Sequence, residues 1–322
     1  MTEFELIRQL AEGLDDRRDD TLVGIGDDAA IVRPGEGDLV TAVDSMVEGV
    51  HFFPDCDPAD LGWKALAVNL SDLAAMGAQP RWALLALTLP QVDQQWLRRF
   101  VTGWRELAQT VGLQLIGGDT CRGPRAVSVT VIGSVLSGRL LRSGARIGDD
   151  LYVSGYIGDA AAGLALLQQR LAQQAREAER CHLISRLHRP QPRTATGLFL
   201  ADHASAAIDV SDGLLADLGH LLRASGAAAT IDLDALPVSD PLKTVVPDDA
   251  TRERLILNGG DDYELLFCAA PNQRAVIASH AEISSVPLTR IGRVHAGEPG
   301  LVRAEGRSQP LLAQGWDHFG EC

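Results

Sequence analysis

The sequence predicts a layered α/β or α+β protein with two domains. Segments with strand-like alternation or β-branching are interleaved with segments of helical periodicity in both halves, which is typical of layered folds. At 322 residues the chain is long enough to form two hydrophobic cores. The pattern changes near residues 137 and 138, so we expect domains over residues 1–138 and 139–322.

The first half is expected to alternate between helices and strands. The expected helices are residues 3–14, 58–76 and 90–111, and the expected strands are 39–43, 81–89, 113–116 and 126–136. Asp57 would cap the second helix, with Pro58 at its first position, and Gly77 with Pro80 beyond it would end the helix. This helix is apolar on nearly every side, which indicates a buried core helix.

The second half repeats the alternation. The expected strands are 151–154, 229–233, 265–269, 288–295 and 300–303, and helices are expected after Asp159 and over 170–190, 193–204, 214–225 and 251–257. Residues 207–213 are typical of a strand that turns into a helix. The acidic, proline-bearing stretch 234–250 is expected to be irregular.

The composition is that of a soluble globular protein with an acidic surface. There are 43 Asp and Glu residues against 29 Lys and Arg, a net charge of −14, and no basic run, which argues against nucleic-acid binding. Only Lys64 and Lys243 are lysines. If the protein handles phosphates, arginines, backbone amides and metal ions must supply the positive charge.

The chain lacks the sequence features of an exported, zinc-stabilised or membrane protein. The five cysteines are scattered without a CxxC pair, which suits a reducing compartment and argues against structural zinc. The acidic N-terminus is unlike a signal peptide, and the longest apolar run, residues 82–89, is too short to cross a bilayer. We therefore expect a cytoplasmic protein that does not bind membranes.

Residues 24–30 match the dinucleotide-binding pattern GxGxxA, and Asp44 follows at about the required spacing. We reject this interpretation because the next segment, 31–40, is typical of a turn between two strands rather than a helix. Asp27 and Asp28 would also repel a pyrophosphate unless a cation lay between them. The motif is a better candidate for metal binding.

The apolar helix 58–76 carries two polar residues on one face, Asn69 and Asp72, at a spacing of three. A buried carboxylate is costly unless it is paired, hydrogen-bonded or bound to a cation. Asp72 is therefore either a structural residue bonded to a nearby amide or arginine, or a metal ligand. From this helix alone the structural interpretation is slightly favoured.

A short apolar run followed by Asp beside Gly or another Asp recurs along the chain. Any single case is more often a turn than a ligand, but several at strand ends favour a site, since ligands bind there in α/β sheets. Clustered carboxylates repel one another unless hard cations such as Mg²⁺ neutralise them, and the cations would attract phosphate. The chain has no P-loop, kinase motif set or GxSxG elbow. Together these features indicate magnesium-dependent phosphate chemistry.

The motifs together resemble those of the thiamine-monophosphate kinase family, in the aminoimidazole-ribonucleotide-synthetase-like superfamily. The matching segments are residues 24–29, 57–61, 69–78, 116–120, 142–145, 209–214, 259–265 and 315–319. They are spread over nearly the whole chain, and as a set they are highly specific. The run Asn-Leu-Ser-Asp-Leu-Ala-Ala-Met-Gly-Ala at 69–78 is the most family-specific of them.

The resemblance implies a homodimer whose N-terminal sheets pair into a β-barrel, with ATP and Mg²⁺ bound by the N-terminal domain. It implies transfer of a phosphoryl group from ATP to thiamine monophosphate, the last step of thiamine diphosphate biosynthesis, with several Mg²⁺ ions. It assigns metal binding to Asp28, Asp44, Asp72, Asp119, Asp209 and Asp212. It assigns ATP binding to Gly118, Asp119, Arg142 and Ser211, and contact with thiamine monophosphate to His51, Asp261 and Trp316.

The sequence departs from the family pattern at two places. The family often has hydroxyl residues before the Asp of the second strand, whereas Ala42 and Val43 precede Asp44 here. The family motif Gly-Gly-Glu-Asp-Tyr-Glu has Asp261 in place of its first Glu, which shortens that side chain by one methylene. The shorter side chain changes the reach of the substrate contact that the resemblance implies for Asp261.

Three of the residues assigned by the resemblance have an alternative interpretation. Arg142 is a phosphate contact or a surface ion pair, Trp316 a partner for the thiazolium ring or a packed anchor, and His51 a substrate contact or a loop hydrogen bond. The acceptor phosphate is already ionised near neutral pH, so no general base is needed. Two rival functions stay open: a related synthetase with another acceptor, and a non-catalytic sensor of ATP or thiamine diphosphate.

Overall fold

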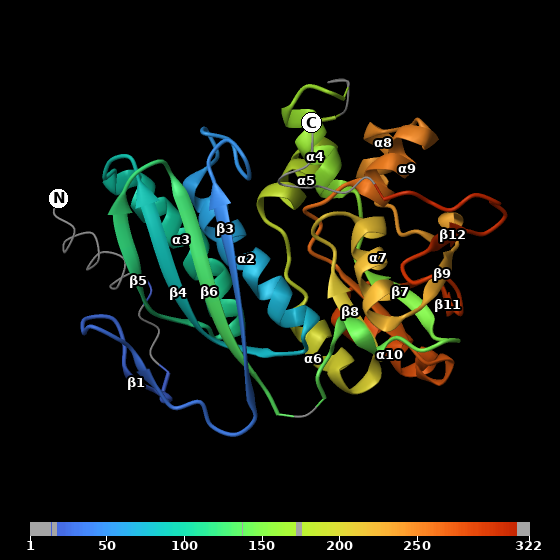
Figure 1. Ribbon diagram of the computed structural model, residues 1–322. Helices are drawn as coiled ribbons and strands as arrows, with labels where there is room; N and C mark the ends of the chain where they lie inside the picture. Colours follow the sequence, from blue (N-terminus) through green and yellow to red (C-terminus); the bar gives the residue numbers. More distant parts are fainter. Residues whose placement is uncertain (1–13, 15–17, 137, 172–175, 314–322) are drawn as a thin grey trace. The chain divides into compact units, whose positions relative to one another are not determined.

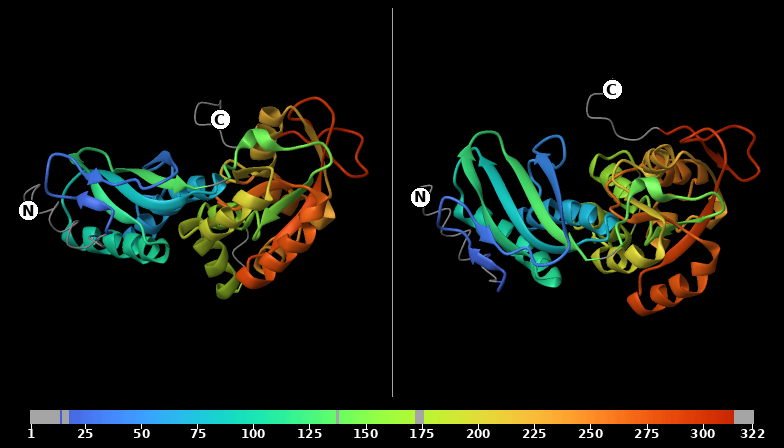
Figure 2. Two further views of the ribbon diagram at one scale, coloured as in Figure 1. Left: turned by 90° about the horizontal axis from the view of Figure 1, so that it is seen from below. Right: turned by 60° about the horizontal axis from the view of Figure 1, so that its bottom comes forward.

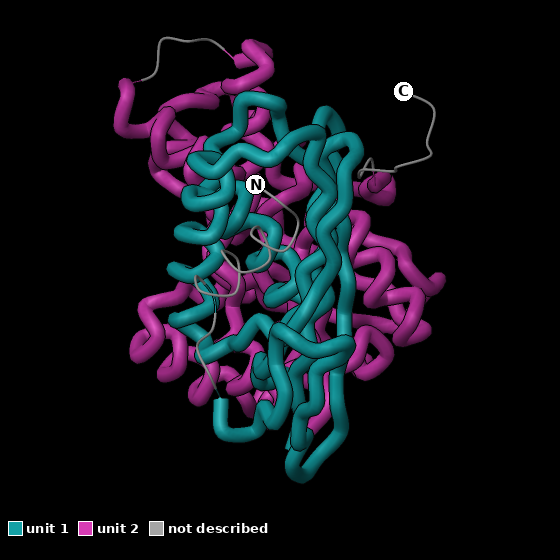
Figure 3. Tube along the Cα trace, turned by 90° about the vertical axis from the view of Figure 1, so that its left-hand side faces the viewer, with its two compact units in different colours: residues 1–73, 78–137 teal, residues 74–77, 138–322 magenta. Residues whose placement is uncertain are grey.

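The computed structural model describes residues 14, 18–136, 138–171 and 176–313. The chain divides into two compact units (Figure 3). Unit 1 comprises residues 1–73 and 78–137, and unit 2 comprises residues 74–77 and 138–322. The expected N-terminal helix 3–14 lies outside the described residues apart from Leu14.

Unit 1 is built on a four-stranded mixed sheet in the order β3-β6-β4-β5 (Figure 1). The strands are β3 (Asp38–Val47), β4 (Gln79–Leu89), β5 (Gln114–Arg122) and β6 (Ala126–Val135). The pair β4–β5 is parallel and the other two pairs are antiparallel. A separate two-stranded ribbon is formed by β1 (Thr21–Val23) and β2 (Ile31–Val32). No helix follows residues 24–30, which confirms that the GxGxxA match is not a dinucleotide fold.

Helices α2 (Pro58–Ala75) and α3 (Gln94–Val111) cover one face of this sheet (Figure 2). Asp57 caps α2 as expected, since its Oδ1 accepts the Ala59 N–H at 2.8 Å. The helices approach closely where glycine leaves room: a Cβ on Gly103 would lie 1.7 Å from the Ala59 carbonyl oxygen. Leu66 and Leu70 of α2 and Val129 of β6 are fully buried between the helices and the sheet.

Three expected boundaries in unit 1 are wrong. The strand that carries Asp44 continues to Val47, and β5 runs through residues 117–120 to Arg122, because both strands keep pairing with a neighbour along their length. Helix α3 begins at Gln94 rather than residue 90, since Asp93 caps it by accepting the N–H groups of Gln95 and Trp96.

Unit 2 contains a six-stranded sheet in the order β12-β9-β11-β7-β10-β8. Its strands are β7 (Asp150–Ser154), β8 (Ala206–Asp209), β9 (Ala228–Ile231), β10 (Leu265–Ala269), β11 (Leu288–His295) and β12 (Val302–Ala304). Only the pair β12–β9 is parallel. Leu151, Val153 and Leu266 are fully buried in its core.

The helices of unit 2 surround this sheet. They are α4 (Asp159–Leu167), α5 (Glu177–His188), α6 (Thr194–His203), α7 (Leu214–Ser225), α8 (Asp240–Val245), α9 (Asp249–Asn258) and α10 (Arg274–Ser284). Short 3₁₀ turns lie at Arg142–Gly144, Leu233–Ala235 and Pro271–Gln273. Helix α8 contradicts the expectation of an irregular stretch over 234–250, because Ser239 caps it by accepting the Leu242 N–H. None of the described helices is long and apolar enough to span a membrane.

Candidate active site

Asp44 lies within strand β3, not at its end as the sequence suggested. It pairs with Val129 of β6, which is fully buried, so the two side chains share the face covered by α2 and α3. Its backbone N–H donates to Asn69 Oδ1 at 2.9 Å, and Asn69 Nδ2 donates to the Ala65 carbonyl at 2.9 Å. The buried amide of Asn69 therefore ties the α2 face that carries Asp72 to the strand that carries Asp44.

Asp72 is half-buried, which corrects the expectation of a buried carboxylate. The helix buries the neutral Asn69 instead, because an amide with two hydrogen bonds costs less to bury than a carboxylate. Asn69 and Asp72 lie three residues apart on α2 and so share one face. The structure therefore brings Asp72 to the same side of the sheet as Asp44.

Asp119 lies in β5 on the other face of the sheet from Asp44. It pairs with Ala86, which pairs with Ser128, and Ser128 Oγ contacts Ser45 Oγ at 2.6 Å on that open face. Strands β3 and β5 are the two edges of the sheet. Three strand spacings of about 4.8 Å separate their backbones by about 14 Å. Asp44 and Asp119 of one chain are therefore too far apart to bind the same ion.

Gly118 has a structural role in β5 that the sequence did not reveal. A Cβ on this residue would lie 1.9 Å from the Leu85 carbonyl oxygen of β4. The close approach of the two strands therefore requires glycine here, whether or not the residue also contacts a ligand.

Asp28 and His51 lie in loops of unit 1. Asp28 is exposed, and its N–H donates to Asp27 Oδ1 at 2.8 Å. His51 Nδ1 accepts the Val47 N–H at 3.0 Å, so a neutral His51 carries its proton on Nε2. The structure thus shows the loop hydrogen bond that the sequence left as one alternative for His51. The substrate contact stays a prediction.

Asp209, Ser211 and Asp212 lie where β8 turns into α7, in residues 209–213, here called the nucleotide loop after the ATP contact that the resemblance predicts for Ser211. Asp209 ends β8 and is buried, whereas Ser211 and Asp212 are half-buried. Asp217, in the first turn of α7, is a residue that the sequence analysis missed. Its Oδ2 accepts the N–H groups of Ser211, Asp212 and Gly213 at 3.0, 3.1 and 3.2 Å. An acidic residue four positions after Gly213, at a helix start, was the available signal.

The carboxylates around this loop repel one another. The pKa of Asp217 is raised to about 7, first by burial and then by the negative charges of Asp209 and Asp212. The N–H groups of Asp212 and Ser211 act in the opposite direction. This concentration of negative charge is what a divalent cation would offset.

The segment 259–264 packs directly against the nucleotide loop. The Asp261 N–H donates to the Ser211 carbonyl and the Tyr263 N–H to the Val210 carbonyl, both at 2.8 Å. Asp261 and Tyr263 have φ angles of +68° and +51°, which is unusual for non-glycine residues and is often found at functional sites. Tyr263 Oη donates to Asp261 Oδ1 at 3.1 Å. The structure therefore brings Asp261 together with Ser211, as a shared substrate and nucleotide site would require.

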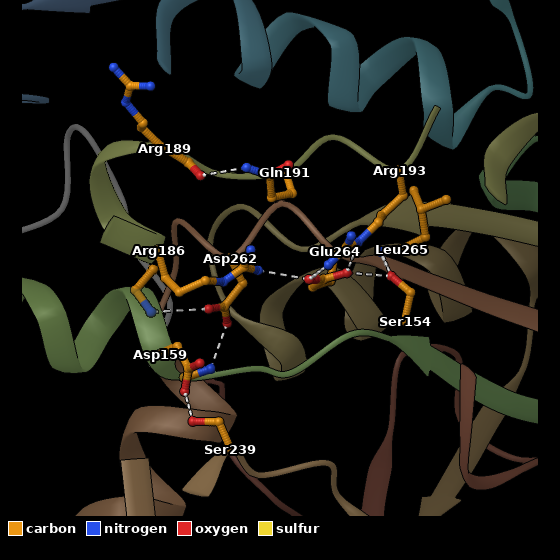
Figure 4. A network of polar contacts seen from close by, with 12 residues as sticks. Ser154, Asp159, Arg186, Arg189, Gln191, Arg193, Ser239, Asp262, Glu264 and Leu265 are labelled. Carbon is orange, nitrogen blue, oxygen red and sulfur yellow. Dashed lines mark hydrogen bonds and ion pairs between the residues drawn. The ribbon is translucent and has the colours of Figure 1, made fainter. Parts of the chain in front are cut away.

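A buried network of hydrogen bonds and ion pairs fixes this segment (Figure 4). Glu264 is fully buried and accepts hydrogen bonds from Ser154, Arg186 and Arg193. Asp262, also buried, accepts the Gly158 N–H at 2.8 Å at the start of α4. Burial raises the pKa of Asp262 well above its ordinary value. Asp262 and Glu264 therefore hold the segment in place through buried hydrogen bonds. Asp261 is the acidic residue of this motif that remains a candidate for ligand contact.

Arg142 is exposed in the 3₁₀ turn beside α7. Its backbone carbonyl accepts the Ser225 hydroxyl at 2.8 Å. The charges of Arg142 and Asp212 both act on His220, whose pKa is lowered mainly by burial, then by Arg223 and Arg142. Arg142 therefore lies within electrostatic range of the nucleotide loop, consistent with a phosphate contact.

Trp316 lies outside the described residues. Within the described part of the chain, His, Cys, Asp and Glu side chains do not gather in groups of three that could hold a metal ion. The candidate ligands nevertheless fit Mg²⁺ by chemistry, because all six are carboxylates, and hard oxygen donors are what this ion prefers.

Two family descriptions match the chain. These are AIR synthase related protein, N-terminal domain, over residues 26–135, and its C-terminal domain over residues 146–303. Thiamine-monophosphate kinase of Salmonella typhimurium is 48% identical over 321 residues, 98% of either chain. The same enzyme of Haemophilus influenzae is 39% identical over 327 residues, covering 100% of this chain and 99% of the relative.

Solved structures of thiamine-monophosphate kinases also match this chain. A thiamine-monophosphate kinase from Stenotrophomonas maltophilia K279a matches with a TM-score of 0.88 and 46% identity, over 96% of this chain and 98% of the other. AaThiL complexed with AMPPCP and TMP matches with a TM-score of 0.79 and 33% identity, over 98% and 97%. The predicted two-domain mixed α/β fold and the resemblance inferred from the motifs are both confirmed. The chain belongs to the AIR synthase related proteins and, among them, to the thiamine-monophosphate kinase family.

Proposed function

We propose that this protein is a kinase that transfers a phosphoryl group from ATP to thiamine monophosphate, producing thiamine diphosphate. The main support is its 48% identity to a thiamine-monophosphate kinase over nearly the whole length of both chains. A second support is the solved relative with an ATP analogue and TMP, which covers 98% of this chain. A third is the backbone pairing of the nucleotide loop with the segment that carries Asp261.

We assign metal binding to the six carboxylates of Asp28, Asp44, Asp72, Asp119, Asp209 and Asp212. Mg²⁺ bound there would neutralise charge on the ATP and acceptor phosphates and align them for transfer. If both bind metal, Asp44 and Asp119 of one chain would hold different Mg²⁺ ions, because they are too far apart to share one.

The chain's own residues would bind and orient the two substrates. Gly118, Asp119, Arg142 and Ser211 are assigned to ATP, and Arg142 supplies a positive charge to the phosphates from an exposed turn. His51, Asp261 and Trp316 are assigned to thiamine monophosphate. The acceptor oxygen is ionised near neutral pH, because the second pKa of a phosphate monoester is about 6. No side chain therefore needs to act as a general base, and positioning accounts for most of the catalysis.

We also propose a homodimer in the cytoplasm. The sheet face of unit 1 opposite α2 and α3 carries exposed apolar side chains, including Leu39, Val43 and Leu84. A second copy pairing there would cover them and close a β-barrel. The scattered cysteines, of which the four in the described part are free, suit a reducing compartment.

The decisive experiment is incubation of the pure protein with Mg-ATP and thiamine monophosphate, followed by chromatography of the products. Equal amounts of ADP and thiamine diphosphate are expected, and EDTA should abolish turnover. ADP with free phosphate but no thiamine diphosphate would contradict the proposal in favour of a synthetase with another acceptor. Thermal stabilisation by ATP or thiamine diphosphate without turnover would contradict it in favour of a sensor.

A further inference from the structure

We infer that Asp217 is a positioning residue for phosphoryl transfer, which sets the affinity for Mg-ATP by holding the nucleotide loop in shape. The inference rests on the proposed function of that loop. Asp217 itself touches neither the substrate nor the metal in this scheme. It acts through the backbone of the residues that do.

The contacts of Asp217 fix three consecutive peptide groups. One carboxylate oxygen accepts the N–H groups of Ser211, Asp212 and Gly213 at 3.0–3.2 Å. Asp217 is only 3% exposed, so these hydrogen bonds face little competition from water. The N-cap residue of α7 is glycine, which has no side chain to perform this task. Asp217 therefore reaches back from inside the helix to organise the loop before it.

The same loop is held from its other side by carbonyl contacts. The Val210 and Ser211 carbonyls accept the N–H groups of Tyr263 and Asp261 at 2.8 Å. A Cβ on Gly260 would lie 2.3 Å from the Ser211 carbonyl oxygen, so the two segments are in close contact. With its amides bonded to Asp217 and its carbonyls to 261–263, the loop has its peptide planes fixed on both sides. The directions in which Ser211 and Asp212 leave the backbone follow from those planes.

The position of Asp217 is electrostatically unfavourable, which indicates that the hydrogen bonds offset a cost. Its carboxylate lies close enough to Asp209 and Asp212 to be repelled by both. A residue needed only to begin α7 could be a serine or threonine at the cap, without this repulsion. The geometry instead places the acceptor where it bonds the loop amides.

The test compares Asp217→Asn and Asp217→Ala with Asp248→Asn and Asp248→Ala. Asp248 is a matched control, because it is an aspartate at the start of a unit 2 helix, α9, whose carboxylate also accepts a backbone N–H, that of Thr251 at 2.8 Å. For each variant we would measure KM for ATP, half-saturation by Mg²⁺, KM for thiamine monophosphate, kcat and Tm. Asn retains an acceptor oxygen, whereas Ala leaves three amides without their partner.

We expect Asp217→Ala to lower kcat/KM for ATP by about 30-fold or more and Asp217→Asn by a smaller factor of about tenfold, since each tenfold loss corresponds to roughly 1.4 kcal/mol. KM for thiamine monophosphate should change by less than about twofold. If Asp217→Ala does not fold, the Asn variant carries the test through the ATP and Mg²⁺ parameters.

Two outcomes would overturn the inference. One is an Asp217 variant with unchanged ATP and Mg²⁺ parameters. The other is a loss that affects both substrates equally and follows Tm as in the Asp248 variants. Calorimetric titration with Mg-ATP separates this inference from the proposed function: a wild-type protein that binds ATP without producing thiamine diphosphate would refute the function, while weaker ATP binding by Asp217→Ala would still support the role of Asp217.

Discussion

At the scale of single residues, Asn69 and Asp72 lie on one helix face but differ in role. Asn69 has a structural role, whereas Asp72 is a candidate metal ligand. Asn69 is buried and bonded to the backbone of β3, whereas Asp72 is half-buried on the same face. Asn69 fixes the helix against the strand, so that contact does not depend on the carboxylate of Asp72. This division favours the metal-ligand interpretation of Asp72 over the structural one.

We therefore expect Asp72→Asn to retain the fold and lose most activity, by about 100-fold or more in kcat, because a neutral amide is a much weaker Mg²⁺ ligand than a carboxylate. Activity and Tm would be measured together. Asp93→Asn, a change at the cap of α3, is the control for loss of a surface carboxylate. An Asp72→Asn protein that unfolds would instead support the structural interpretation.

The sequence predicted the shared face of Asn69 and Asp72, since helical spacing is a local property. It did not predict which side chain would be buried or that Asn69 would bond Asp44, because a tertiary partner is not encoded in spacing. Asp217 was missed for a related reason. An acidic residue in a first helical turn is common, and only the fold shows that it bonds three amides of a loop.

At the scale of elements, strand β5 shows why a glycine pair can mislead. Gly117 and Gly118 suggested the end of a strand, yet β5 passes through both and pairs with β4 up to Arg122. Gly118 is required by the close approach of the two strands, which the sequence does not report. Helix α8 was missed because its six residues are too few to show a period, and its cap at Ser239 was hidden among prolines and acids.

Gly118→Ala is expected to destabilise unit 1 strongly, because the added Cβ would meet the Leu85 carbonyl oxygen at 1.9 Å. Gly117→Ala is the matched control, since its Cβ would meet only the flexible Leu84 side chain, at 3.2 Å. We expect Tm to fall by on the order of 10 °C for the first variant and by much less for the second. Equal Tm values for both variants would show that β5 can shift away from β4.

Three elements of unit 2 are joined by one buried carboxylate, that of Asp150 at the start of β7. It accepts hydrogen bonds from Arg274 of α10 at 2.6 and 2.8 Å and from Arg290 of β11 at 3.3 Å. Hydrogen bonding by Arg274, followed by the charges of Arg274 and Arg290, lowers the pKa of Asp150 despite its burial. The stability from this ion pair is thus present above the unfolded pKa, near 3.8, and is lost as the pH falls through the lower folded value.

Asp150→Asn is accordingly expected to lower Tm at neutral pH by on the order of 5 °C, because two arginines lose their charged partner. The difference from wild type should shrink as the pH falls below 3.8 and through the lowered folded pKa of Asp150, where the wild-type carboxylate also becomes protonated. Asp240→Asn, at an exposed i,i+3 pair with Lys243, is the control. A Tm difference that stays constant over the whole pH range would contradict an electrostatic origin.

At the scale of the whole molecule, the composition predicted the class of chemistry better than it predicted the assembly. A net charge of −14 with two lysines requires that cations accompany any phosphate substrate. The alternation of strands and helices predicted two mixed α/β domains, because layers follow from local patterns. The open face of the unit 1 sheet could not be predicted, since the sequence does not show which faces the helices leave uncovered.

The last prediction concerns the face of the unit 1 sheet that α2 and α3 leave uncovered. Leu39 of β3 is 51% exposed on the side of the sheet away from α2 and α3, and it lies five residues before Asp44. If two sheets close a barrel through this face, Leu39→Glu places a like charge in both copies at the interface, where its desolvation is unfavourable. We expect light scattering after size exclusion to show a dimer for the wild type and a monomer for Leu39→Glu.

The matched control is Ile283→Glu, which replaces an 84% exposed apolar residue of α10 in unit 2. It adds the same charge to the same chain, so it should leave the dimer intact if the effect depends on the sheet face. Tm of the isolated monomer would show whether unit 1 stays folded after dissociation. A wild-type monomer, or equal dissociation by both variants, would contradict the proposal that this face pairs with a second copy.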